Sequence, residues 1–216
     1  MGYLISFLIP TLRERGTKFK SLTDKLFLQI EEHKLQNEVE VISIYDNRNL
    51  KLSVKRNMMQ KMASGMYFIH MDDDDRVADD YCITVVNEIK KLVKYSHAGT
   101  GNQLVPDVIT YNQFCEVNGK FMIVKTNTKT DMRLNYVGME GDIPVYERIP
   151  WQFHLWNRAR FGHIYRTDSD TNAREDQNWL KKIYLEYPNS FYNIDKILHY
   201  YYFDTNGSGE NKSTCQ

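Results

Sequence analysis

The first half of the 216-residue chain alternates between two hydrophobic patterns. In the first pattern, apolar residues run almost without interruption, which predicts strands, the earliest of them buried on both faces. In the second, apolar residues recur every three or four positions, which predicts helices with one buried face. The expected strands span 3–9, 38–45 and 66–71, and the expected helices span 19–30, 53–62 and 80–93. This alternation predicts an α/β fold with a mixed, mostly parallel central sheet flanked by helices.

Polar and special residues mark the expected ends of these elements. Pro10 closes the first strand. Ser53 is expected to cap the second helix, and Gly65 to end it. Asp79 or Asp80 is expected to cap the third helix. Each element of the first half therefore has its own boundary signal.

The second half follows a different pattern. The apolar segments 108–117 and 120–125 are separated by Asn118-Gly119, a pair that favours the positive φ angles of a type I′ turn. We therefore expect a β-hairpin there. Between 126 and 149 the composition is polar and broken, which indicates a long functional loop.

Three further elements complete the expected fold. A proline-initiated short helix is predicted at 150–156, a longer helix at 174–186 and a last strand at 197–203. The segment 206–216 is rich in the small polar residues of linkers. We therefore expect one domain over 1–205, followed by a tail that connects to further domains of a longer polypeptide.

Composition narrows the possible partners. Lysine plus arginine and aspartate plus glutamate number 28 each, so the chain has no general attraction to nucleic acid or to an anionic membrane. No apolar run approaches the length of a membrane span, and the first ten residues lack the pattern of a signal peptide. Three scattered cysteines fit a reducing compartment. These features together predict a cytoplasmic protein.

Four adjacent carboxylates, Asp72 to Asp75, directly follow the third predicted strand. Like charges at a strand end repel one another, most strongly where water is partly excluded. A divalent cation relieves that repulsion, and Mg²⁺ or Mn²⁺ prefers one or two carboxylates plus phosphate oxygens. Open α/β sheets bind ligands beyond the carboxyl ends of their strands. We therefore expect a metal site here, the alternative being a solvated acidic turn.

Two cations, Lys55 and Arg56, lie in the first turn of a predicted helix. The helix dipole disfavours each of them there by roughly 0.3–1 kcal/mol. A bound anion reverses that preference, and free backbone N–H groups would add to its binding. Diphosphate is therefore a candidate ligand, and the alternative is that both side chains extend into solvent.

Three other acids are candidates for chemistry. Asp46 follows the second predicted strand, where its carboxylate could accept from the N3–H of uracil, although acids after strands are often only turn residues. Glu175 and Asp176 open a predicted helix. One of them could deprotonate an acceptor hydroxyl, although the helix dipole alone also favours acids at that position.

Histidines give weaker signals. His70 lies inside the third predicted strand, which indicates a structural role. For His154 and His199, packing or surface roles are the more common outcome. His199 has the better case as a ligand, because it lies on the last predicted strand near the expected sheet end.

In order and spacing, these motifs resemble the inverting GT-A glycosyltransferases of the large family-2 type. The resemblance begins with the family's opening strand and its Pro-Thr turn. It continues with a block of three successive motifs, Arg-Asn, Ala-x-Gly and Leu-Asp-x-Asp-Asp. The Trp-x-x-Leu region and the Glu-Asp motif follow. The matching segments are 3–11, 55–57, 62–65, 67–75, 150–157 and 174–176. The match extends over most of the chain, from about Tyr3 to Asp204.

The resemblance implies metal-dependent transfer of a sugar, with inversion, from a UDP-sugar of glucose or rhamnose type to a glycan or glycoprotein hydroxyl. It implies Mn²⁺ or Mg²⁺ bound by Asp74, with Asp72 as a further ligand. His199 is expected as another metal ligand because of its place on the last predicted strand. Asp176 would be the catalytic base, with Glu175 as the alternative. Residues expected at the donor are Pro10, Thr11, Arg13, Asp46, Lys55, Arg56, Asn57, Asp72 and Asp73.

Some alternatives stay open. Asp73 and Asp75 allow the DxD motif to shift by one residue, and the segment 45–48 replaces the family's usual Asp-Asp-Gly-Ser. A sugar-nucleotide nucleotidyltransferase would share the sheet and the acids, but its Gly-rich basic loop is reduced here to one glycine within 11–16. A catalytically inactive nucleotide- or glycan-binding module is the other alternative. The chain is also similar to compact glycosyltransferase domains of large algal viruses, which implies the host cytoplasm.

Overall fold

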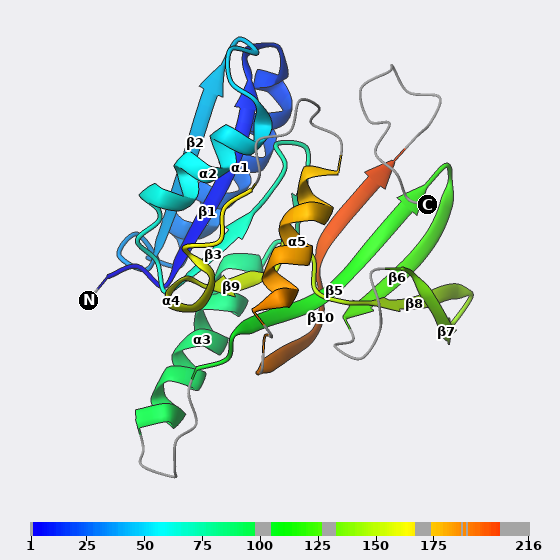
Figure 1. The fold of residues 1–216 in the computed structure, drawn as a ribbon. Helices are drawn as coiled ribbons and strands as arrows, with labels where there is room; N and C mark the ends of the chain where they lie inside the picture. Colours follow the sequence, from blue (N-terminus) through cyan, green and yellow to red (C-terminus); the bar gives the residue numbers. More distant parts are fainter. Residues whose placement is uncertain are drawn as a thin grey trace.

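The computed structural model of the chain describes residues 2–97, 105–126, 133–166, 174–186, 188 and 190–203. Helices alternate with strands in its first half, and strands dominate its second half (Figure 1). The helices are α1 (Gly16–Glu32), α2 (Leu52–Met62), α3 (Tyr81–His97), α4 (Arg158–Phe161) and α5 (Glu175–Leu185), with a 3₁₀ turn at Arg13–Arg15. The strands are β1 (Ile5–Leu12), β2 (Val39–Asp46), β3 (Tyr67–His70), β4 (Arg76–Val77), β5 (Val108–Val117), β6 (Lys120–Thr126), β7 (Asn135–Glu140), β8 (Ile143–Arg148), β9 (Leu155–Asn157) and β10 (Phe191–Phe203).

The strands of the described residues form one mixed sheet. Its main path runs β2-β1-β3-β9-β5-β6-β8-β7, and β10 pairs with β5 and with the short β4. β2, β1 and β3 are parallel, whereas β9 runs antiparallel to both of its neighbours. Beyond β9, antiparallel hairpins combine with the parallel pairs β5–β10 and β6–β8. The predicted α/β class, with a mixed sheet flanked by helices, is confirmed.

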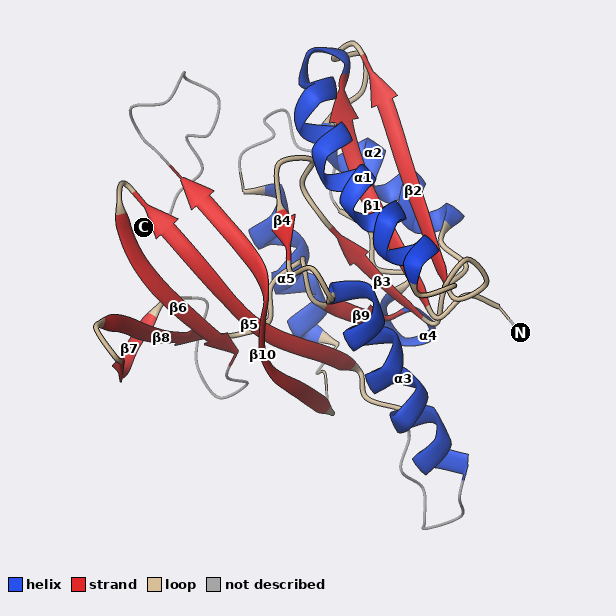
Figure 2. Cartoon of the chain, turned by 180° about the vertical axis from the view of Figure 1, so that it is seen from behind, coloured by secondary structure: helices blue, strands red, loops and turns tan. Residues whose placement is uncertain are grey.

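Helices cover both faces of the parallel part of the sheet (Figures 1 and 2). On one face, Phe7 of β1 belongs to the same buried cluster as Leu26 of α1 and Val85 of α3. The next residue, Leu8, belongs to the cluster on the other face, with Trp179 of α5. Because successive strand residues point to opposite faces, one strand supplies both cores. This explains why the sequence of β1 is apolar almost throughout.

The predicted β5–β6 hairpin is confirmed. Val117 pairs with Lys120 across the turn. Asn118 and Gly119 between them have φ angles of 51° and 74°. Both angles are positive, as a type I′ turn requires, so the local turn chemistry sets the register of the hairpin.

The long loop predicted over 126–149 is wrong where the structure describes it. β7 and β8 form an antiparallel hairpin, and β8 pairs in parallel with β6. Most side chains of β7 are exposed, since this strand lies at the edge of the sheet. Without a buried face the strand shows no apolar alternation, so its sequence resembles a loop. Residues 127–132 lie outside the described part of the chain.

The short helix predicted at 150–156 is also wrong. Leu155–Asn157 forms β9, which is inserted between β3 and β5, and α4 follows it. The Asn157 side chain caps α4 by accepting from the backbone N–H groups of Ala159 and Arg160. A three-residue strand is too short to show a hydrophobic period, so β9 could not be predicted from the sequence pattern.

Other predicted boundaries agree more closely. α5 matches the helix expected at 174–186, and β10 begins at Phe191, six positions before the strand expected at 197. Irregular pairing between Ile194 and His199 interrupts the pattern of β10 and explains the late predicted start. None of the helices in the described ranges is long and apolar enough to cross a membrane. The segment 206–216 lies outside the described residues, so the expected domain end stays a prediction.

Ser53 and Gly65, the residues predicted to cap and to end the second helix, do not have these roles. Ser53 is buried within the first turn of α2, which has no side-chain cap. The helix ends at Met62, three residues before Gly65. Gly65 instead lies against β1, where an added Cβ would come within 2.8 Å of backbone atoms of Ile5 and Ser6. A glycine is therefore required by the close approach of two backbones.

We expect Gly65→Ala to lower the free energy of unfolding by about 1–3 kcal/mol, because the overpacked backbones must move apart. Gly16→Ala is the matched control, since the space around Gly16 is open and this position starts α1. There alanine should be neutral or stabilise by about 0.4–1 kcal/mol. Urea unfolding followed by circular dichroism measures both variants. Equal stabilities would contradict the packing role of Gly65.

Candidate functional site

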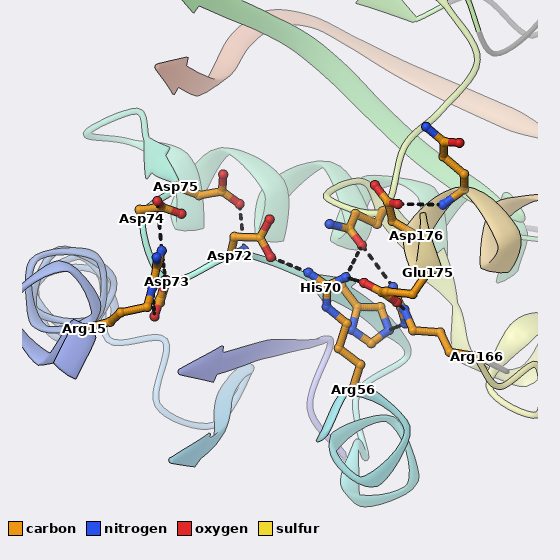
Figure 3. A network of polar contacts seen from close by, with 12 residues as sticks. Arg15, Arg56, His70, Asp72, Asp73, Asp74, Asp75, Arg166, Glu175 and Asp176 are labelled. Atoms are coloured by element: carbon orange, nitrogen blue, oxygen red, sulfur yellow. Dashed lines mark hydrogen bonds and ion pairs between the residues drawn. The ribbon is translucent and has the colours of Figure 1, made fainter. Parts of the chain in front are cut away.

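The acidic turn, Asp72–Asp75, lies directly beyond β3 (Figure 3). β3 runs parallel to β1, so the turn and the end of β1 lie at the same edge of the sheet. The backbone N–H of Asp75 donates to the Asp72 carbonyl at 3.1 Å, and the N–H of Asp72 donates to the Asp75 carboxylate at 2.8 Å. These two bonds fix the turn and give its side chains different surroundings.

Asp73 is the interior member of the acidic turn and is 4% exposed. Its carboxylate accepts from the Thr11 hydroxyl at 2.7 Å and from Arg15 Nε at 2.7 and 2.9 Å. A second guanidinium nitrogen of Arg15 lies 2.6 Å from the same carboxylate. Asp73 therefore anchors the turn to the end of β1 and the start of α1.

Asp72 and Asp74 are more accessible, with 47% and 25% of their side-chain surfaces exposed. Asp74 pairs with Arg15 at 2.9 Å and with Lys18 at 3.4 Å, and Asp72 accepts from Arg56. Asp72 and Asp74 are separated by the anchoring Asp73. This alternation favours the DxD register that begins at Asp72 over a register shifted by one residue.

The surroundings of Asp72 disfavour its charge. Burial raises the pKa of Asp72 to about 6, Arg56 opposes the rise, and the neighbouring acids Asp75, Asp74 and Asp176 add to it. Water reaches the exposed side of this carboxylate, which weakens the effect of burial. The three neighbouring acids add to the rise that burial causes, and a nearby cation would relieve their repulsion.

The acidic turn suits a particular kind of metal site. Within the described ranges, no three His, Cys, Asp or Glu side chains converge as a ready-made cage. Asp72 and Asp74 offer hard oxygen donors, and Mg²⁺ or Mn²⁺ binds through one or two carboxylates with waters and phosphates completing the coordination. These residues therefore fit a cation that binds together with a phosphate ligand.

Asp46 and Lys55 form a buried pair beside the end of β1. The Lys55 amine donates to the Asp46 carboxylate at 2.7 Å and to the Thr11 carbonyl at 3.0 Å. The Leu50 N–H donates to the other Asp46 oxygen at 2.8 Å. Burial opposes the change, yet Lys55 and the Leu50 N–H lower the pKa of Asp46. Lys55 therefore neutralises a protein carboxylate instead of extending into solvent.

Arg56 is also directed inward and is 2% exposed. It donates to the Gln152 side-chain carbonyl at 2.9 Å and forms ion pairs with Glu175 and Asp72. Arg56 thus connects the acidic turn to the start of α5 (Figure 3). The cations in the first turn of α2, expected near diphosphate, contact protein acids in this structure.

Glu175 lies between two arginines. Besides Arg56, it pairs with Arg166, whose Nε is 2.5 Å from the carboxylate. Arg166 also approaches His70 Nε2 at 2.9 Å and donates to Gln152 at 3.0 Å. Burial holds the pKa of His70 well below its ordinary value, so its neutral ring can accept from Arg166. Glu175 is therefore engaged within the protein.

Asp176, the next residue, is partly exposed. One of its oxygens accepts from the Gln177 backbone N–H at 2.8 Å. It lies near enough to Asp72 to raise the pKa of that carboxyl, and Figure 3 shows the two acids on the same side of the Arg56–Glu175 contact. Of the two predicted bases, Asp176 is the accessible one.

His199 is fully buried, and its ring stacks on Phe153 at 4.3 Å between centroids. The Gln113 amide donates to His199 Nδ1 at 2.9 Å, and Arg148 donates to the Gln113 oxygen at 3.2 Å, which orients the amide. The ring proton therefore lies on Nε2, which is 3.2 Å from Asp75. His199 would bind a cation through Nε2 only if Gln113 turned over.

The remaining predicted residues are spread around the end of β1. Pro10 is buried beside Thr11, and Arg13 is exposed in the following 3₁₀ turn. Asn57 exchanges hydrogen bonds with the backbone of Arg166 at 2.8 and 2.9 Å. Asn57 thus holds a neighbouring segment, while Pro10 and Arg13 border the edge where the acidic turn lies.

Several residues of the site were missed from the sequence. Arg15 was missed in favour of Arg13, two positions earlier, although a cation at the start of a helix was a usable signal, as it was for Lys55. Gln152 and Arg166 carry no motif of their own. Their roles depend on contacts between distant segments, which a single sequence does not reveal.

No protein-family model matches the chain, and no curated protein matches it. Among solved structures, it is similar to S. aureus TarS. The crystal structure of TarS 1-349 in complex with UDP-GlcNAc matches with a TM-score of 0.57 and 17% identity, over 96% of this chain and 60% of that chain. The complex with UDP matches with a TM-score of 0.55 and 16% identity, over 93% of this chain and 61% of that chain.

The chain has the GT-A fold. At this level of identity the likeness shows the fold alone, and the chain spans less than two thirds of the TarS structures that it matches. Within the GT-A sheet, the acidic turn lies at the carboxyl end of β3, close to the start of α5. This is the edge at which open α/β sheets bind ligands.

We expect Asp73→Ala to lower the free energy of unfolding by about 3 kcal/mol, because Arg15 and Thr11 lose a buried partner. Asp74→Ala is the control and should cost less than about 1 kcal/mol, because its ion pairs are partly solvated. Urea unfolding at neutral pH measures both. A larger loss at Asp74 would show that Asp73 is not the anchor of the turn.

Proposed function

We propose that the chain transfers a sugar from a UDP-sugar donor to a hydroxyl acceptor with inversion of configuration. The observation that carries this proposal is the placement of accessible acids on both sides of one site, the acidic turn after β3 and Asp176 at the start of α5. TarS, which has a similar fold, is complexed with UDP-GlcNAc and with UDP. A common fold and a suitable set of carboxylates therefore support the same function.

On the donor side, we assign uracil binding to Asp46. Its lowered pKa keeps it ionised, and a carboxylate has more acceptor sites than its contacts with Lys55 and Leu50 use. An ionised acid can accept from the N3–H of uracil, whereas cytosine has no hydrogen at that position. Pro10 and Arg13 would border the nucleotide at the end of β1.

We propose Asp74 and Asp72 as the ligands of Mn²⁺ or Mg²⁺. Such a cation, when bound, neutralises the diphosphate and stabilises the charge of the leaving UDP. Arg15 and Lys18, which contact Asp74, would add positive charge beside the diphosphate. We also propose His199 as a third ligand of the metal. This role requires the side-chain amide of Gln113 to rotate, so that its oxygen accepts from His199 Nδ1 and leaves Nε2 free of its proton.

On the acceptor side, we propose Asp176 as the general base. The acceptor oxygen attacks the anomeric carbon while the bond from that carbon to the diphosphate breaks. UDP leaves with the electron pair of that bond, and the acceptor proton passes to a carboxylate oxygen of Asp176. Attack from the face opposite to UDP inverts the configuration.

The donor sugar and the acceptor are proposed by class. The family resemblance suggests a glucose or rhamnose type of donor, and the TarS complex adds GlcNAc as a candidate. The proposed acceptor is a hydroxyl of a glycan or glycoprotein. We also propose that the protein is encoded by an algal virus and acts in the cytoplasm of the host cell. Only the family resemblance supports this proposal.

We expect UDP and Mn²⁺ to bind together and to stabilise the fold. UDP with Mn²⁺ at about 100 times the dissociation constant should add about 2.7 kcal/mol, whereas Mn²⁺ alone should add little because it lacks phosphate ligands. Thermal unfolding with Mn²⁺, with UDP, with both and with GDP plus Mn²⁺ measures this. A shift with both that is no larger than with Mn²⁺ alone would contradict the donor site. A larger shift with GDP would contradict only the role of Asp46.

The same binding identifies the metal-binding acid. Asp74→Ala should lose Mn²⁺-supported UDP binding, whereas Asp73→Ala should retain most of it despite its lower stability. Titration calorimetry well below the unfolding temperature separates binding from stability. A greater loss of binding in Asp73→Ala would place the DxD motif in the shifted register.

We expect Asp176→Asn to reduce turnover by about 10²–10⁴-fold while UDP and Mn²⁺ affinities change little. Asparagine keeps the size of the side chain but cannot take up a proton at neutral pH. The measurement is UDP release from UDP-GlcNAc, UDP-glucose and UDP-rhamnose, with Asp142→Asn, an exposed acid in the β7–β8 turn, as the control. Near-normal turnover by Asp176→Asn would exclude it as the base.

The same assays separate the rival functions. A nucleotidyltransferase would release pyrophosphate from UTP and a sugar phosphate. An inactive binding module would bind UDP with Mn²⁺ but release no UDP from any UDP-sugar. Release of UDP from a UDP-sugar would exclude both.

A further inference from the structure

An ion cluster that is buried except at Asp72 joins the acidic turn to the start of α5 (Figure 3). It consists of Asp72, Arg56, Glu175 and Arg166. Arg56 contacts Asp72 and Glu175, which belong to the two sides of the proposed site. Arg166 contacts the other oxygen of Glu175 at 2.5 Å. The cluster therefore forms a continuous connection between donor-side and acceptor-side acids.

The cluster is electrically balanced and largely dry. The side chains of Arg56, Arg166 and Glu175 are at most 3% exposed. Two arginines and two acids give no net charge. Removing one charged member leaves an unpaired buried charge, whereas removing one of each sign preserves the balance.

The start of α5 contacts this cluster through Glu175. The helix has no side-chain cap, and Arg174 before it has a positive φ of 62°. Glu175 and Asp176 lie in the first turn, where unpaired backbone groups make helices prone to fray. The two arginines hold Glu175 and thereby fix the turn that carries Asp176.

Arg166 is itself held in a defined position. Its backbone N–H donates to Asn57, and its guanidinium lies 4.5 Å from the centre of the Trp179 ring. One of its nitrogens also contacts His70 at 2.9 Å. A planar guanidinium with these contacts orients Glu175 more strictly than a flexible ammonium would.

We propose that Arg166 is a positioning residue, which through Glu175 places Asp176 for proton removal from the acceptor. This inference rests on the proposed function. Arg166 touches neither donor nor acceptor and acts through Glu175. A misplacement of about 1 Å at a reacting group can reduce the rate by about 10²-fold. Loss of Arg166 should therefore lower kcat and leave UDP affinity nearly unchanged.

The test compares Arg166→Met with the double variant Arg166→Met/Glu175→Gln. The single variant leaves an unbalanced buried acid and should lower Tm by about 10 °C, with kcat for UDP release reduced by about 10²-fold. The double variant restores charge balance, so its Tm should recover to within a few degrees of the wild type. Its kcat should stay low, because the anchor of Asp176 is still missing.

Lys182→Met is the matched control. Lys182 lies on α5 and donates to the carbonyl of Tyr165, next to Arg166, without contacting the ion cluster. It should lower Tm slightly and leave kcat unchanged. All variants are assayed with Mn²⁺ and the UDP-sugar that the wild type turns over fastest, and UDP affinity is measured by calorimetry.

The outcomes are distinct. Recovery of Tm without recovery of kcat in the double variant supports the positioning role, and the double variant keeps the test valid if Arg166→Met does not fold. If kcat recovers together with Tm, or if Arg166→Met is folded and fully active, Arg166 is only structural and the inference is overturned. A wild type that releases no UDP from any UDP-sugar overturns the proposed function, and this inference with it.

Discussion

The burial of Arg56 between Asp72 and Glu175 is the interaction on which the site depends. A buried charge without a partner costs several kcal/mol, so Arg56 can stay buried only while both acids remain beside it. Arg56 and Glu175 are 119 positions apart in the sequence, and their contact fixes the end of β3 relative to the start of α5. The pair of Asp73 with Arg15 fixes the other side of the acidic turn. Asp73 and Glu175 serve as anchors, whereas Asp72, Asp74 and Asp176 keep part of their surface exposed to solvent.

Much of the fold could be predicted because its first half obeys local rules. β1 and β3 supply both cores and therefore have apolar sequences, and Asn118-Gly119 sets its hairpin by turn geometry alone. The predictions were wrong over the described part of 126–149 and over 150–156, where local patterns are weak. β7 is an exposed edge strand and β9 is three residues long, so neither shows a hydrophobic period. Their pairing is decided by the neighbouring strands, which lie far away in the sequence.

For the candidate site, the sequence indicated the acids but not their partners. Four consecutive carboxylates after a buried strand are unusual enough to mark this edge of the sheet as the candidate site. Arg15 pairs with the interior acid, Asp73, and Arg166 pairs with Glu175, the neighbour of the partly exposed Asp176. Lys55 was expected to face either solvent or a phosphate, but it is buried against Asp46. Charge type and position could thus be predicted, whereas ion pairing could not, because it arises from tertiary contacts.

A crystal structure of the chain with UDP and Mn²⁺, with the ion located by its anomalous scattering, tests most directly whether the acidic turn and Asp176 flank one donor site. We predict a single manganese peak about 2.1 Å from a carboxylate oxygen of Asp74, with the diphosphate completing the coordination. The uracil should lie toward Asp46, and Asp176 should face the position of the transferred sugar. Manganese held by other residues, or UDP bound away from this edge of the sheet, would contradict the proposed site.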